Sequence, residues 1–143
     1  NRGANFTLNE DMENCLGPGK KSLHTIIPGF LMKDGKAVGP FGVMGGFMQP
    51  QGHVQVIMNT LDFMMNPQET LDAPRWQWVG GKKIQVEKTF PVEIVEELKR
   101  RGHEMEVLES SLTFGRGQII WRDENGVLCG ATEPRADGAV AVW

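Results

Sequence analysis

Residues 41–67 have the sequence FGVMGGFMQPQGHVQVIMNTLDFMMNP, which joins a short apolar run, a pair of glycines and an apolar repeat. Phe41 to Met44 predicts a strand, and Gly45-Gly46 predicts a turn because glycine adopts positive φ at little steric cost. From Val54 onward, apolar residues recur at offsets of 0, 3, 4, 7, 10 and 11, the spacing of an amphipathic helix. We therefore predict a helix over residues 51–66, closed by Pro67, with this stripe facing the core.

On either side of this unit, the sequence predicts short strands, hairpins and a second helix. Residues 1–21 are poor in apolar residues and predict a loop. Proline at position 91, three basic residues at 99–101 and Gly102 bound a second helix over 92–101. Strands are predicted at 23–27, 30–33, 37–38, 75–79, 82–88, 105–108, 118–122, 127–132 and 138–143, with a helical turn at 68–72. The fold class that follows is α+β, with layers of sheet and helix.

Composition limits the classes of function. With 15 basic and 18 acidic residues, the net charge of −3 does not suit a dedicated nucleic-acid binder. The apolar runs are short and interrupted, so we expect no membrane span, and Asn1 to Asn9 lack the pattern of a signal peptide. The length of 143 residues predicts one domain or a piece of a larger one, and the compartment stays open.

Two short motifs are candidates for catalysis or substrate binding. Gly45-Gly46 ahead of a helix can aim successive amide hydrogens into one cavity and hold a developing oxyanion, although from these residues alone a plain strand-to-helix turn is the favoured interpretation. His24-Thr25 places an imidazole beside a hydroxyl, but adjacent strand residues point to opposite faces. A structural role or a substrate contact from Thr25 is therefore favoured over a nucleophile–base pair.

The remaining candidates favour structural roles. His53 is expected to be a surface or helix-capping histidine and His103 to face solvent, and three scattered histidines predict no metal site. Residues 133–138 predict a salt-bridged turn. Trp76 and Trp78 alternate onto one strand face, where packing is the favoured role.

Several motifs occur in order along nearly the whole chain. They are NRGANF at residues 1–6, PGKKSLHTIIP at 18–28, DGK at 34–36, MGG at 44–46, DAPR at 72–75 and GATEPRADG at 130–138. With these motifs the chain resembles the small, C-terminal subunit of the gamma-glutamyltranspeptidase family. It is similar to the bacterial branch of gamma-glutamyltransferase-like and acylase-like proteins, whose members carry the glycine pair within GGFMQPQGH.

The resemblance implies an αββα sandwich of the N-terminal nucleophile hydrolase type. In that family a precursor cuts itself into a large and a small subunit, and the new N-terminal Thr of the small subunit attacks the substrate, with its own α-amino group as base. By this comparison, residues 1–143 are a small-subunit portion that lacks the first strands and the nucleophile. The implied partners are the large subunit and a small γ-glutamyl or acyl amide, and no cofactor is implied.

The resemblance also assigns roles to six residues. Gly45 and Gly46 match the oxyanion-hole glycines of the family. His24 and Thr25 stand where many members have two serines on the substrate α-carboxylate, and Arg2 and Asn5 stand where many members bind the α-ammonium. A cationic Arg repels an ammonium group, so we hypothesise a shift toward acyl groups that lack the α-amine.

Two kinds of function stay open at this point. One is an enzyme subunit that transfers γ-glutamyl groups or hydrolyses amides, including an acylase of the cephalosporin or glutaryl type. The other is a non-catalytic binding or assembly domain that retains the fold.

Overall fold

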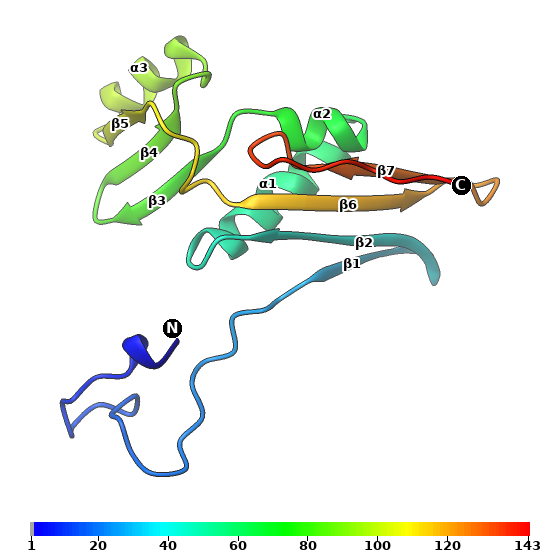
Figure 1. Cartoon of the computed structure of the whole chain (residues 1–143). Helices are drawn as coiled ribbons and strands as arrows, with labels where there is room; N and C mark the ends of the chain where they lie inside the picture. Colours follow the sequence, from blue (N-terminus) through cyan, green and yellow to red (C-terminus); the bar gives the residue numbers. More distant parts are fainter. Residues whose placement is uncertain (1) are drawn as a thin grey trace.

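The computed structural model describes residues 2–143, apart from the side chain of Arg2. It contains a short 3-10 helix, three α-helices and seven strands in two sheets (Figure 1). In chain order the elements are η1 (Arg2–Asn5), β1 (Gly29–Lys33), β2 (Lys36–Met44), α1 (Met48–Leu61), α2 (Pro67–Asp72), β3 (Trp76–Gly80), β4 (Lys83–Glu87), α3 (Val92–Arg100), β5 (Glu104–Leu108), β6 (Arg116–Arg122) and β7 (Leu128–Thr132).

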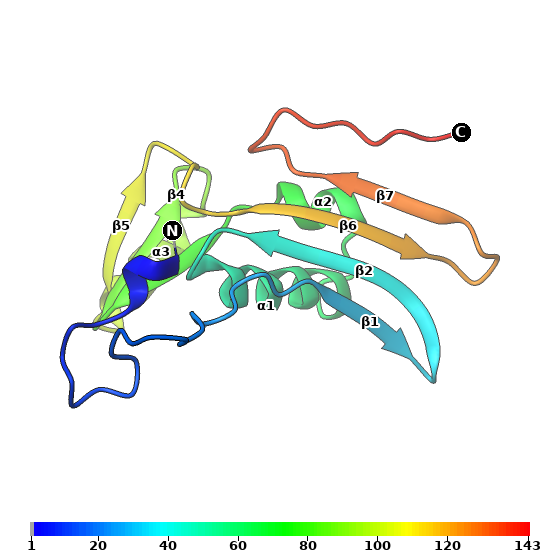
Figure 2. The same cartoon turned by 60° about the horizontal axis from the view of Figure 1, so that its bottom comes forward.

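The larger sheet is antiparallel, with strand order β1-β2-β6-β7. Helices α1 and α2 lie on one side of it, and the opposite face is turned to the viewer in Figure 2. The core lies between this sheet and the helices. It contains residues from strands β2, β6 and β7 and from both helices, namely Val43, Val56, Leu71, Ile119, Trp121 and Ala131. Alternation along β6 places Ile119 and Trp121 inward and leaves Ile120 45% exposed on the opposite face.

Helix α1 begins earlier than predicted, at Met48 rather than residue 51, and ends at Leu61 rather than 66. Proline at position 50 is compatible with the first helical turn, where amide hydrogens lack intrahelical acceptors. The predicted buried stripe was also wrong: Val54 and Leu61 are each 52% exposed. The face that is buried carries Gly52, whose missing side chain lets the helix approach Val43.

The smaller sheet has the order β3-β4-β5 and confirms the predicted hairpin at Gly80-Gly81. Strands β4 and β5 are parallel, and α3 forms the crossover between them. Two glutamines of α1 bind the backbone of β3 as a neighbouring strand would. Gln51 bonds to the N–H and carbonyl of Trp78 at 2.7 and 3.2 Å, and Gln55 to those of Trp76 at 3.1 and 2.9 Å. This pairing attaches the smaller sheet to the helix layer.

Two predicted strands are absent from the described part of the chain. Residues 22–28 run without regular structure before β1, and residues 138–143 lie beside β7 without joining it. Both segments carry strand-like apolar residues, but they make no ladder of backbone hydrogen bonds. The side chain of Val140 instead packs over Gly130. The strands predicted at 37–38 and 41–44 form one continuous strand, β2.

No helix among residues 2–143 has the length and apolar character needed to cross a membrane.

Candidate functional site

The Gly45-Gly46 turn connects β2 to α1 at the junction of the two sheets. Gly45 has φ +149° and Gly46 has φ +61°, so both residues use conformations that favour glycine. The turn continues into the helix, because the amides of Met48 and Gln49 donate to the carbonyls of Gly45 and Gly46, each at 3.1 Å. Among the described residues, no hydrogen bond engages the amide hydrogens of Gly45 or Gly46 themselves. These donors lie at the positive end of the α1 dipole, where an anion is stabilised.

A third glycine, Gly115, packs against the backbone of the turn. A Cβ placed on Gly45 would lie 2.9 Å from the Cα of Gly115, and one on Gly115 would lie 2.6 Å from the carbonyl oxygen of Met44. The two backbones therefore touch, and neither position has room for a side chain. Gly46 has no other atom within 4 Å of the corresponding point, so its side of the turn is open.

The open side faces a cavity of about 1000 Å³. We call it the acyl cavity, after the substrate-binding role that the resemblance implies for residues that line it. Five of the six predicted site residues line it: Asn5, His24, Thr25, Gly45 and Gly46. The backbone of Arg2 belongs to η1, and its side chain lies outside the described residues. Because His24 and Thr25 lie in an irregular segment, the expectation that strand geometry separates them was wrong, and both line the same cavity.

Gln49 is a residue of the acyl cavity that the sequence analysis missed. Its side-chain amide donates to the carbonyl oxygen of Thr25 at 2.5 Å and, more weakly, to that of Gly46 at 3.4 Å. It thereby attaches the irregular segment that carries His24 and Thr25 to the first turn of α1. The only sequence signal was its position three residues after Gly46, which places it one helical turn from the glycine pair.

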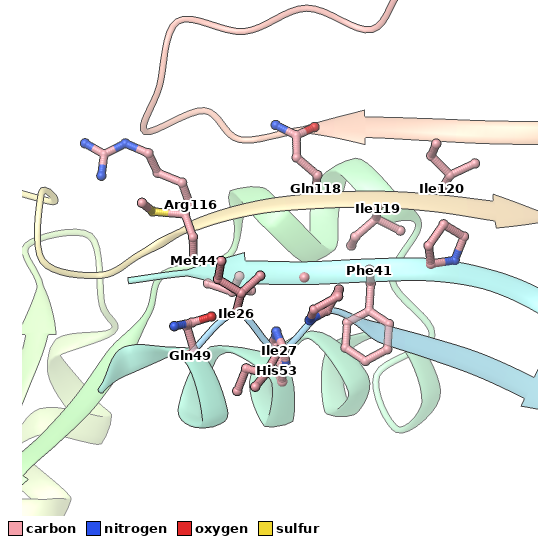
Figure 3. A pocket seen from close by; sticks show the side chains of 14 residues that line it. Ile26, Ile27, Phe41, Met44, Gln49, His53, Arg116, Gln118, Ile119 and Ile120 are labelled. Carbon is pink, nitrogen blue, oxygen red and sulfur yellow. The ribbon is translucent and has the colours of Figure 1, made fainter. Parts of the chain in front are cut away.

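Beside the acyl cavity, a smaller apolar cavity of about 390 Å³ lies along β2 and α1 (Figure 3). Ile26, Ile27, Phe41 and His53 line it, and the rings of Phe41 and His53 meet edge to face with centroids 5.3 Å apart. Burial lowers the pKa of His53 from its ordinary value of 6.5, so the imidazole is neutral at pH 7. His53 is thus a packed, half-buried residue within α1, where a surface or helix-capping histidine was expected.

A buried ionic network lies behind Gly115. Arg75 and Glu133, which are 2% and 1% exposed, form an ion pair at 2.8 Å. Arg75 also donates to the carbonyls of Phe114 and Gly115 at 3.0 and 3.2 Å. The predicted salt-bridged turn is confirmed by the Arg135–Glu133 pair at 2.7 Å, but Arg135 also binds Glu87, so the network is larger and more buried than a turn.

Ion pairing within this network offsets the cost of burying the Glu133 carboxylate. Burial acts to raise the pKa of the Glu133 carboxyl. The positive charges of Arg75 and Arg135, together with a 2.5 Å hydrogen bond from the amide of Gly117, outweigh burial and leave this pKa lowered. Glu133 is therefore ionised at neutral pH and fixes Arg75, which in turn fixes the backbone of residues 114 and 115.

The described part of the chain contains no candidate metal site. Across residues 2–143, no group of three or more His, Cys, Asp or Glu side chains is placed to hold a metal ion.

A family model described as Gamma-glutamyltranspeptidase matches residues 1–143. The chain belongs to the gamma-glutamyltranspeptidase family. It is 37% identical over 145 residues to the Glutathione hydrolase-like YwrD proenzyme of Bacillus subtilis (strain 168), a match that covers 97% of this chain and 28% of that protein. The chain thus spans little more than a quarter of this relative, whose name describes a proenzyme.

Solved structures of family members share the fold. The cephalosporin acylase from Bacillus halodurans is 64% identical with a TM-score of 0.93, covering 99% of this chain and 27% of that one. The gamma-glutamyltranspeptidase from Pseudomonas nitroreducens complexed with L-DON is 26% identical with a TM-score of 0.78, covering 91% of this chain and 68% of that one. The chain therefore has part of the mixed α/β fold of N-terminal nucleophile hydrolases of this family, which confirms the predicted fold class and family.

Proposed function

We propose that residues 1–143 supply the oxyanion hole and the acyl-binding surface of a self-processed amide hydrolase or acyltransferase. The single observation that carries the proposal is that no described residue forms a hydrogen bond with the amide hydrogens of Gly45 and Gly46, two residues that border the cavity lined by Asn5, His24 and Thr25. Preorganised donors of this kind stabilise the charge that develops on a carbonyl oxygen during acyl transfer.

The reaction that fits this arrangement is attack by a threonine hydroxyl outside these 143 residues. The hydroxyl oxygen forms a bond to the amide carbon, its proton moves to the threonine α-amine, and the carbonyl electron pair moves onto oxygen, facing Gly45 and Gly46. Collapse of this intermediate breaks the C–N bond, and the departing amine takes up the proton. The resulting acyl-enzyme then passes its acyl group to water or to another amine.

The acyl group is expected to be a carboxylic acyl chain without an α-amine. Among the described residues that line the acyl cavity there is no Asp or Glu, so its wall offers no carboxylate for an ammonium group. On the complete protein, glutaryl anilides should show a higher kcat/KM than γ-glutamyl anilides. A clear preference for γ-glutamyl would reject this part of the proposal.

The partner is the remainder of the same precursor, and the sheet face opposite α1 and α2 is where it would pack. This face exposes Phe30, Met44 and Ile120, which are 56%, 58% and 45% exposed. Apolar residues gathered on one sheet face need a second layer to cover them. Mass spectrometry of the complete protein tests the scheme, because it should show two chains, the second beginning with Thr. An uncut chain without that Thr would favour a non-catalytic assembly domain.

A further inference from the structure

The segment that brings His24 and Thr25 to the acyl cavity belongs to no strand. We call this segment, residues 22–28, the strap. Strand β1 pairs with β2 as far as Gly29, which lies opposite Phe41. Beyond that point, β2 continues and pairs with β6 alone. The strap is therefore placed by contacts other than a β-ladder.

Two side chains of α1 reach the strap. Gln49 donates to the carbonyl oxygen of Thr25 at 2.5 Å. His53 lies one helical turn further along the same face of α1, and Figure 3 shows both side chains. A Cβ placed on Gly42 would lie 3.8 Å from the Cα of Pro28 and 4.0 Å from Nε2 of His53. The imidazole therefore lies where the strap separates from β2.

The surroundings of the His53 ring are apolar. Ile26 and Ile27 of the strap line the same cavity, and the ring of Phe41 meets the imidazole edge to face. Burial alone lowers the pKa of His53, and no hydrogen bond or charged group among the described residues offsets it. The neutral imidazole thus packs as an aromatic ring beneath the strap.

Charged groups on the surrounding elements do not favour a proton on His53. Of the described residues that line this cavity, only Arg116 of β6 is charged at neutral pH, and none is acidic. Helix α1 contains no Asp, Glu, Lys or Arg, and the charges of β1 and β2 are Lys33 and Lys36 at the far hairpin. His24 of the strap lines the acyl cavity instead. A protonated His53 would therefore lie in an apolar cavity with a second cation and no counter-ion.

We propose that His53 is a positioning residue that seats the strap while its imidazole is neutral, and that its protonation in mild acid releases the strap and weakens binding of the acyl group. The inference rests on the proposed function, because it acts through His24 and Thr25. The seated strap keeps the pKa of His53 below its ordinary value of 6.5. Acid below that value therefore shifts the equilibrium toward the released strap.

The contacts that carry the proposal lie within this chain. Helix α1, which carries His53 and Gln49, covers the side of the sheet away from the face proposed to bind the remainder of the precursor. The seat of the strap therefore does not depend on residues of that face.

The test measures KM and kcat of the complete, processed protein between about pH 7.5 and about pH 5, on whichever of glutaryl anilide and γ-glutamyl anilide it hydrolyses faster. His53→Ala should raise KM about 3–10-fold near neutrality with a smaller change in kcat. His53→Phe keeps an aromatic ring that takes no charge, so it should restore KM. Toward acid, KM of the unmodified protein should rise about tenfold more than KM of His53→Phe. His103→Gln, outside the cavity, should keep the pH profile of the unmodified protein.

Titration of His24 and of the substrate occurs in every variant, so it cancels when the unmodified protein is compared with His53→Phe. A second readout does not depend on activity. In an NMR titration of the complete protein carrying isotope-labelled histidine, Gln49→Leu loosens the strap and should raise the pKa of His53 toward 6.5. Gln68→Leu, away from the strap, should leave that pKa unchanged.

The outcomes separate the two claims. If the unmodified protein hydrolyses neither anilide, the proposed function fails and this inference fails with it. If the protein is active but KM of the unmodified protein and of His53→Phe change alike with pH, the inference is overturned while the proposed function stands. It is also overturned if Gln49→Leu leaves the pKa of His53 unchanged, or if His53→Ala lowers kcat rather than binding and His53→Phe does not restore it.

Discussion

The side-chain amide of Gln49 donates a hydrogen bond to the carbonyl oxygen of Thr25 at 2.5 Å, across 24 residues of sequence. This bond joins the irregular segment that carries His24 and Thr25 to the helix that follows Gly45 and Gly46. The two predicted halves of the site, acyl recognition and oxyanion stabilisation, are thereby held in one geometry.

Replacing Gln49 should therefore weaken substrate binding more than chemistry. We expect Gln49→Leu in the complete protein to raise KM about 3–10-fold with a smaller change in kcat, because a neutral hydrogen bond contributes about 0.5–1.5 kcal/mol and positions groups that bind ground and transition states alike. Gln68→Leu is the matched control, since Gln68 bonds to the backbone of Thr132, away from the cavity. An equal effect of both variants on KM would contradict this role of Gln49.

The two glycines of the turn should respond differently to substitution. Gly45→Ala forces a Cβ to within 2.9 Å of the Cα of Gly115, whereas Gly46→Ala meets no other atom, bears the cost of positive φ and points a methyl group into the acyl cavity. Steady-state assays should show kcat reduced about 100-fold by Gly45→Ala, because the displaced turn moves an oxyanion donor away from its acceptor, and less than tenfold by Gly46→Ala, whose methyl group should mainly raise KM. A larger loss of kcat for Gly46→Ala than for Gly45→Ala would contradict this arrangement of the two donors.

The glutamine pairing of α1 with β3 should be visible in stability. Gln55 is 7% exposed and satisfies both the N–H and the carbonyl of Trp76. Gln55→Leu leaves both backbone groups unpaired and should lower the free energy of unfolding by about 1–3 kcal/mol, measured by urea denaturation of the complete protein. Gln51→Leu, at the more exposed end of the helix, should lower the free energy of unfolding by a smaller amount. If Gln55→Leu leaves the free energy of unfolding unchanged, the pairing of α1 with β3 does not stabilise the protein.

The buried network should make stability depend on pH in a defined direction. The pKa of Glu133 is lowered in the folded state, so its stabilisation is complete above its ordinary pKa of 4.5 and is lost as pH falls through the lower folded value. Glu133→Gln should cost about 3–5 kcal/mol of unfolding free energy at pH 7, because it leaves Arg75 buried and partly unpaired.

Denaturation across pH gives the check. The difference between the unmodified protein and Glu133→Gln should be constant near neutrality and should shrink below about pH 4. Glu109→Gln is the control, because Glu109 pairs with Lys88 at the surface with 89% of its side chain exposed, and it should not alter stability. A Glu133→Gln penalty that stays the same down to pH 2 would contradict the assigned role of the carboxylate.

Features encoded by neighbouring residues were predictable from the sequence. The hairpin at Gly80-Gly81, the helix ending before Gly102 and the β6–β7 hairpin all formed where turn and capping residues occur. The glycine pair was recognised as a turn for the same reason. Its φ values and its position before α1 follow from local chemistry.

Features that depend on distant contacts were not predictable. The apolar stripe of α1 suggested one buried face, but Gly52 against Val43 and Gln55 against Trp76 select another. Residues 22–28 resemble a strand in composition, yet a side chain of α1 holds them instead of a backbone ladder. The Arg75–Glu133 pair joins residues 58 apart in sequence, and only the folded chain shows that it supports the glycine turn.

The most direct test of the account is a crystal structure of the complete protein bound to an electrophilic amide analogue that forms a tetrahedral adduct. The account predicts the adduct oxygen about 2.7–3.1 Å from the amide nitrogens of both Gly45 and Gly46. An adduct oxygen held by other donors, with these two amides directed elsewhere, would contradict it.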